Sequence, residues 1–144
     1  MRVMALDIGD RRIGVALSDP LGRLATPLTI IKRKRKLEDI QRILELAKEH
    51  GVERIVIGLP RRPDSSLGPQ AEKVLDLGRE LERHTALPVE YLDERLTTVE
   101  AERRLMEAGV PGPERRQRVD MVAAAVILED YLSTLRRERR GEGA

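Results

Sequence analysis

Three acidic residues stand where a carboxylate could take part in catalysis. Asp7 follows an almost entirely apolar segment, so we expect it at the carboxyl end of a buried strand. Glu94, preceded by Asp93, follows a second strand-like segment, Pro88–Leu92. Asp120 lies on the apolar stripe of the last predicted helix. Because an unpartnered buried carboxylate is costly, Asp120 needs either an arginine or a cation.

If these carboxylates meet at one edge of a sheet, they form a set of hard oxygen ligands for Mg²⁺ or Mn²⁺. One or two such ions, about 3.5–4 Å apart, can activate water for phosphodiester cleavage. We therefore predict Asp7, Glu94 and Asp120 as catalytic metal ligands, with Asp93 as the alternative to Glu94. The other interpretation is structural: Asp7 organises a turn, the adjacent acids favour a helix N-terminus, and Asp120 pairs with Arg95.

Composition excludes several other chemistries. The 144 residues include no cysteine, which excludes a thiol nucleophile and a zinc-thiolate cluster. The glycine-containing segment near the N-terminus lacks the lysine of a P-loop. The longest apolar run, 121–128, is too short to cross a bilayer, and we expect a soluble cytoplasmic protein without a secretory leader.

Basic residues are clustered although the net charge is only +2. The clusters lie at 32–36, 61–62, 115–118 and 136–140, and each is either a nucleic-acid contact or a solvated, salt-bridged surface. With two tyrosines as the only aromatic residues, contact with the phosphate backbone is favoured over base stacking. The predicted nucleic-acid-binding residues are Arg11, Arg12, Arg61, Arg62, Arg95, Arg115, Arg116 and Arg118.

The periodicity predicts the elements that would position these residues. Residues 1–19 form a hairpin, in which Gly9 and Gly14 would leave room for a large ligand. Pro27 favours an edge position for a third strand. Thr97 and Glu100 have the spacing of a capping box that opens a helix. The remaining elements are a helix over 37–51, a strand over 55–57, an irregular loop over 58–69, a helix over 69–84, and a final helix from about 113 to 137.

This order predicts an α/β fold: a mixed five-stranded sheet of three antiparallel N-terminal strands and two parallel strands, flanked by helices. We expect one domain over residues 1–138 and a flexible tail over 139–144. The predicted acids all fall at the carboxyl edge of this sheet, where open α/β sheets bind ligands.

Four segments together resemble the YqgF family, also called RuvX: 5–19, 58–60, 93–102 and 119–128. The resemblance implies an RNase H-like fold and a metal-dependent nuclease that helps to mature the 5′ end of small-subunit ribosomal RNA. It places the family's acids on Asp7, Glu94 and Asp120. The loop 61–68 departs from the family pattern, which often has Asp-Gly followed by Ser or Thr.

Several functions remain open at this point. The first is a nuclease acting on precursor 16S rRNA, which could work with ribosomal particles as a monomer or weak homodimer. A second is a resolvase of four-way DNA junctions, and a third is a non-catalytic RNA-binding protein. An actin-like ATPase is disfavoured because that architecture needs two such domains.

Overall fold

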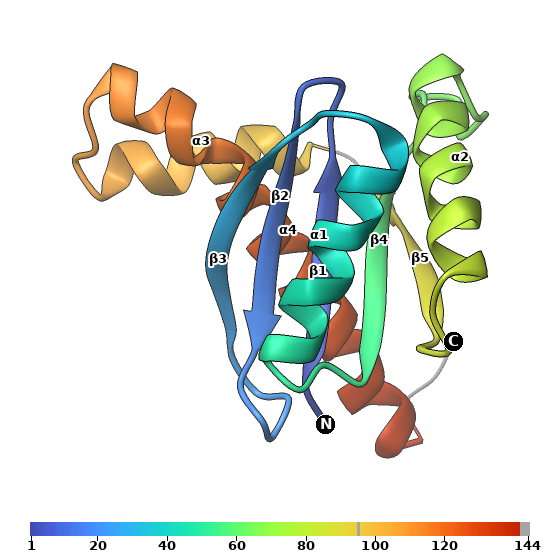
Figure 1. Ribbon diagram of the computed structural model, residues 1–144. Helices are drawn as coiled ribbons and strands as arrows, with labels where there is room; N and C mark the ends of the chain where they lie inside the picture. The colour runs from blue at the N-terminus through green and yellow to red at the C-terminus, as the bar shows by residue number, and fades with distance from the viewer. Residues whose placement is uncertain (95, 142–144) are drawn as a thin grey trace.

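The computed structural model describes residues 1–94 and 96–141. Its centre is a five-stranded mixed sheet with the strand order β3-β2-β1-β4-β5 (Figure 1). The first three strands are antiparallel, whereas β4 and β5 run parallel to β1. The elements are β1 (Val3–Ile8), β2 (Arg12–Ser18), β3 (Ala25–Lys32), α1 (Lys36–Glu49), β4 (Arg54–Pro60), α2 (Pro69–Arg83), β5 (Val89–Glu94), α3 (Thr97–Glu107) and α4 (Gly112–Arg139). The predicted mixed α/β sheet is confirmed, including the edge position of the strand that contains Pro27.

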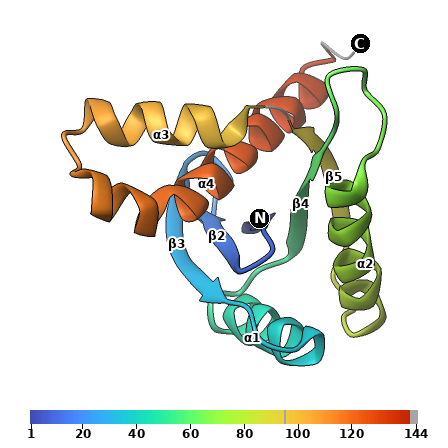
Figure 2. The same ribbon diagram turned by 90° about the horizontal axis from the view of Figure 1, so that it is seen from above.

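Helices cover both faces of the sheet. The helices α1 and α2 lie on one face and α4 crosses the other (Figures 1 and 2). Strand β1 supplies both cores because its side chains alternate: Met4 and Leu6 join the α1–α2 side, while Val3 and Ala5 join the α4 side. Asp7 continues the second series, so its side chain belongs to the face that α4 covers.

Helix α3 and the first part of α4 extend beyond the sheet as a helical hairpin (Figure 2). The two helices share a small core of their own, which consists of Ala101, Leu105, Val119 and Ala123. None of the helices in the described part of the chain is long and apolar enough to span a membrane.

Three local predictions are wrong, each for a physical reason. Strand β4 continues through Pro60, because Leu59 and Pro60 pair with the last two residues of β5, so the loop begins at residue 61. For the same reason Asp93 and Glu94 lie within β5 and not after it. The capping box does not form, because the N-cap position is Leu96 and the Thr97 hydroxyl is bonded elsewhere.

The role predicted for Gly14 is also wrong. A Cβ atom at this position would lie 1.8 Å from the backbone oxygen of Asp120. The missing side chain therefore makes room for helix α4, and not for a ligand. This close crossing sets Asp120 directly over the β1–β2 ladder, in which Asp7 pairs with Gly14.

Candidate active site

The three predicted acids line one pocket of about 330 Å³ at the carboxyl edge of the sheet. Asp7 comes from β1, Glu94 from β5 and Asp120 from α4. Gly58, Pro60 and Ile127 complete much of its wall. Larger surface hollows lie elsewhere, among them one between β3 and α1 and one beside Asp10 and Lys73, which these acids do not line. A neighbouring hollow near Asp130 shares Glu94 with the pocket but contains neither Asp7 nor Asp120.

Asp7 occupies a rigid and partly buried position between the pairing partners of β1. Burial and, to a smaller extent, the negative charge of Asp120 together raise the pKa of its carboxyl group from 3.8 to about 7. The side chain therefore gains little from hydration and lies near a like charge. A cation placed between the two carboxylates would favour their ionised forms.

Glu94 is the acid of the adjacent pair that enters the pocket. Its side chain is buried, and it accepts a 2.6 Å hydrogen bond from Oγ1 of Thr97. Its pKa is raised to about 7, mainly by burial; the charges of Asp130 and Asp7 act in the same direction, and the Thr97 hydrogen bond opposes the shift. Asp93 projects to the opposite, exposed face, where its Oδ1 lies 2.7 Å from Nε of Arg61.

Asp120 has an arginine partner in the structure. Nε of Arg12 donates a 2.7 Å hydrogen bond to Oδ2 of Asp120, forming an ion pair in which the arginine is half exposed. Arg95, the partner suggested by the sequence, lies outside the described residues. The ion pair draws the Asp120 carboxylate toward β2. Within residues 1–94 and 96–141, no three Asp, Glu or His side chains are already gathered as a metal-binding group.

Two residues near the pocket were missed by sequence reasoning. Thr97 was interpreted as a helix cap, although it bonds Glu94. Asp130, which lies further along α4 than Asp120, raises the pKa of Glu94. Its side chain is exposed, and its sequence context does not distinguish it from an ordinary surface acid. Only the path of α4 across the sheet brings Asp130 near Glu94.

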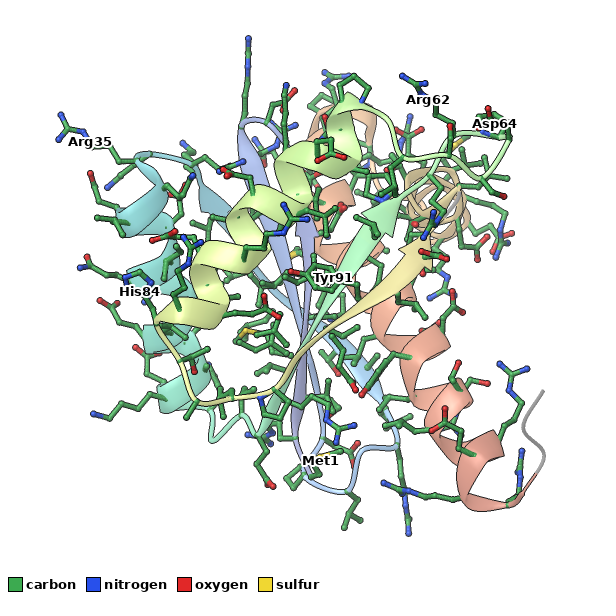
Figure 3. All side chains as sticks on the ribbon, turned by 90° about the vertical axis from the view of Figure 1, so that its right-hand side faces the viewer. Met1, Arg35, Arg62, Asp64, His84 and Tyr91 are labelled. Carbon is green, nitrogen blue, oxygen red and sulfur yellow. The ribbon has the colours of Figure 1, made fainter. Side chains whose placement is uncertain are left out.

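Apart from Arg95, which is outside the described residues, the predicted basic residues lie on three separate parts of the surface. Arg11 and Arg12 lie at the β1–β2 turn, while Arg61 and Arg62 begin the loop after β4, where Arg62 points outward beside Asp64 (Figure 3). The third group, in the first turns of α4, comprises Arg115, Arg116 and Arg118. Arg115 donates to the backbone oxygen of Val110.

The class of fold to which the protein belongs is shown by comparison with solved structures. Thermus thermophilus RuvC in complex with a Holliday junction substrate has a similar fold, with a TM-score of 0.60 at 18% identity over 99% of this chain and 98% of RuvC. The fowlpox virus resolvase with junction DNA gives a TM-score of 0.54 at 11% identity, covering 94% of this chain and 99% of the resolvase. The fold is therefore the RNase H-like fold of these nucleases.

Sequence comparison then gives the family. A family model described as "RuvX: Holliday junction resolvase" matches residues 1–134. A protein of Moorella thermoacetica named "Putative pre-16S rRNA nuclease" is 51% identical over 135 residues, covering 94% of this chain and 96% of its own length. A protein of the same name from Pelotomaculum thermopropionicum is 46% identical, covering 99% of this chain and 94% of its own. The chain belongs to the RuvX family, a family of nucleases.

Proposed function

We propose that this protein is a divalent-metal-dependent nuclease that cleaves phosphodiester bonds in structured RNA, and that its substrate is the 5′ region of precursor 16S rRNA. The observation that carries the proposal is the pocket in which Asp7, Glu94 and Asp120 meet from three distant segments. The names of the relatives from Moorella and Pelotomaculum support the choice of substrate. A cytoplasmic protein that acts on ribosomal particles follows from this proposal.

The donor set fits Mg²⁺ or Mn²⁺, because all three candidate ligands are carboxylates and hard cations prefer oxygen. Burial raises the pKa values of Asp7 and Glu94, and a bound cation would favour the ionised form of both carboxylates. When bound, the metal would activate a water molecule and stabilise the charge on the leaving oxygen. Asp120 would join the other two by exchanging its partner Arg12 for the ion.

The protein's own groups prepare the pocket for this chemistry. The β-ladder fixes the backbone of Asp7, and the Thr97 hydroxyl orients Oε2 of Glu94. The apolar side chain of Ile127 forms part of the wall and limits the access of bulk water. Arg12, once released from Asp120, is placed at the rim to contact a substrate phosphate.

The matched pair Asp7→Asn and Asp93→Asn tests the proposal. Both changes remove one carboxylate charge, but Asp7 lines the pocket and Asp93 faces away from it. In single-turnover cleavage of precursor 16S rRNA with Mg²⁺, we expect Asp7→Asn to lose at least about 10²-fold in rate. Asp93→Asn should retain nearly full activity. Equal rates for Asp7→Asn and wild type would contradict the catalytic assignment.

A four-way DNA junction is the second candidate substrate. The description of the matching family and the fold shared with junction resolvases favour it. Parallel assays on a junction and on precursor RNA separate the two, since preferential and symmetric cutting of the junction would exclude the RNA assignment. A non-catalytic RNA-binding protein predicts no cleavage of either substrate and salt-sensitive binding that Asp120→Asn leaves unchanged.

A further inference from the structure

Four basic side chains form a second charged surface beside the acidic pocket. Arg11 belongs to the β1–β2 turn, and Lys32, Lys34 and Arg35 belong to the end of β3 and the connection to α1. We refer to these four residues as the basic ridge. All four are exposed, and none has an acidic partner among the ion pairs of the described residues. Figure 3 shows Arg35 pointing away from the protein.

Two other basic clusters each contain an arginine that already has an acidic partner. Arg61 is paired with Asp93, and Arg118 lies 3.7 Å from Glu114. At the β1–β2 turn, the nearby acid Asp10 is itself paired with Lys73. The basic ridge therefore has the charge available to bind an anionic partner.

A buried ion pair holds the ridge in place. Asp39 is only 2% exposed, and its two carboxylate oxygens accept hydrogen bonds from Nε of Arg33 at 3.2 Å and from the backbone N–H of Lys34 at 2.9 Å. Nη1 of Arg33 also donates to the backbone oxygen of Gly9 at 3.0 Å. The backbone N–H of Arg33 donates to the oxygen of Arg11 at 2.9 Å. The β3–α1 connection is thus fastened to the β1–β2 turn.

This fastening fixes the ridge relative to the acidic pocket. Gly9, whose backbone oxygen accepts the hydrogen bond from Arg33, also lines the pocket and lies two residues after Asp7. Lys32 pairs in register with Arg12, the partner of Asp120. A rigid path of a few residues therefore connects the ridge to two of the three candidate catalytic acids.

We propose that the basic ridge binds the phosphate backbone of a paired RNA stem that flanks the bond to be cut. The proposal rests on the nuclease function proposed above. Charge complementarity favours a phosphate backbone, and the rigidity of the ridge suits the regular spacing of phosphates in a duplex. Base stacking has no platform, because Tyr131 is buried and the ring of Tyr91 packs against Gly78. The ridge sets where the stem lies and so which bond reaches the acids.

The test measures binding separately from cleavage. A triple variant, Lys32→Gln/Lys34→Gln/Arg35→Gln, is compared with a control triple, Lys48→Gln/Arg79→Gln/Arg83→Gln. The control removes the same charge from exposed residues of α1 and α2 that lie outside the basic clusters. Fluorescence anisotropy in EDTA gives the affinity for a paired RNA stem and for an unpaired RNA of equal length over a range of salt concentrations, and circular dichroism checks that both variants fold.

The ridge variant should bind the stem at least about tenfold more weakly than wild type at physiological salt, with a salt slope lower by about 2–3. The control triple should lose less, and the unpaired RNA should be less affected. The proposal is overturned if both triples bind the stem alike, or if the ridge variant loses paired and unpaired RNA equally. If wild type binds through the ridge yet cleaves no RNA, the nuclease proposal fails while the ridge stands.

Discussion

Replacing Asp7 with asparagine should stabilise the metal-free protein above neutral pH, although it should abolish cleavage. The folded state raises the pKa of Asp7 from 3.8 to about 7, first by burial and then through the charge of Asp120. At about 1.4 kcal/mol per pKa unit, keeping this group ionised costs the folded state up to about 4 kcal/mol. Burying an asparagine amide offsets about 1–3 kcal/mol of that gain. The expected net stabilisation is about 1–3 kcal/mol at pH 8.

The direction of the pH dependence follows from proton linkage. Between about pH 4 and pH 7 the folded protein holds a proton at Asp7 that the unfolded chain has released. The free energy of unfolding of wild type therefore falls as the pH rises through this window. Below it Asp7 is neutral in both states, so wild type and Asp7→Asn should converge. Glu94, whose pKa is also raised to about 7, contributes a similar fall in both proteins.

Thermal and urea unfolding in EDTA at pH 4, 6 and 8 measure this difference. Each kcal/mol should move the midpoint of a chain of this size by roughly 3–5 °C. Asp93→Asn is the control, because its exposed carboxylate at the other face should change stability by less than about 1 kcal/mol. An Asp7→Asn variant no more stable than wild type at pH 8, or a difference that does not grow with pH, would refute the electrostatic reasoning.

Three further predictions concern the neighbours of the acids. Arg12→Gln should lower the Mn²⁺ concentration needed for half-maximal cleavage by freeing Asp120, and a higher metal requirement would contradict that competition. Gly14→Ala should destabilise the fold by more than about 3 kcal/mol in urea unfolding, because its Cβ would overlap the backbone of α4, and wild-type stability would be incompatible with the close crossing. Thr97→Val removes a hydrogen bond that lowers the pKa of Glu94, so the acidic limb of the pH–rate profile should move to higher pH, and Thr97→Ser should restore it. An unchanged profile in the valine variant would argue against this role of the hydroxyl.

The parts of the fold that sequence predicted are those with local or periodic signals. An apolar run predicted β1, alternation predicted β2, and Pro27 predicted the edge position of β3. The position of Asp120 on the same helix face as Ile127 and Tyr131 could be predicted, because helical spacing places the three residues on one face. These signals were enough to predict that the three acids lie close together, and in the structure they line one pocket.

The wrong predictions concern residues whose main contact lies with another element of the fold. The Gly14 backbone accommodates Asp120 of α4, which is more than a hundred positions away in sequence. No local signal shows this contact, and the segment resembled a ligand-binding hairpin. Thr97 had the spacing of a helix cap, but its hydroxyl donates a hydrogen bond to Glu94 instead. The pairing of Arg12 with Asp120 likewise depends on where α4 crosses the sheet, which no local pattern encodes.

The central claim is that Asp7, Glu94 and Asp120 together hold a divalent cation, and a Mn²⁺ soak of crystals with anomalous diffraction tests it most directly. The account predicts an anomalous peak in the pocket, contacted by oxygens of all three carboxylates, with Asp120 released from Arg12. Millimolar Mn²⁺ that gives no peak in this pocket, while Asp120 stays paired with Arg12, would contradict it.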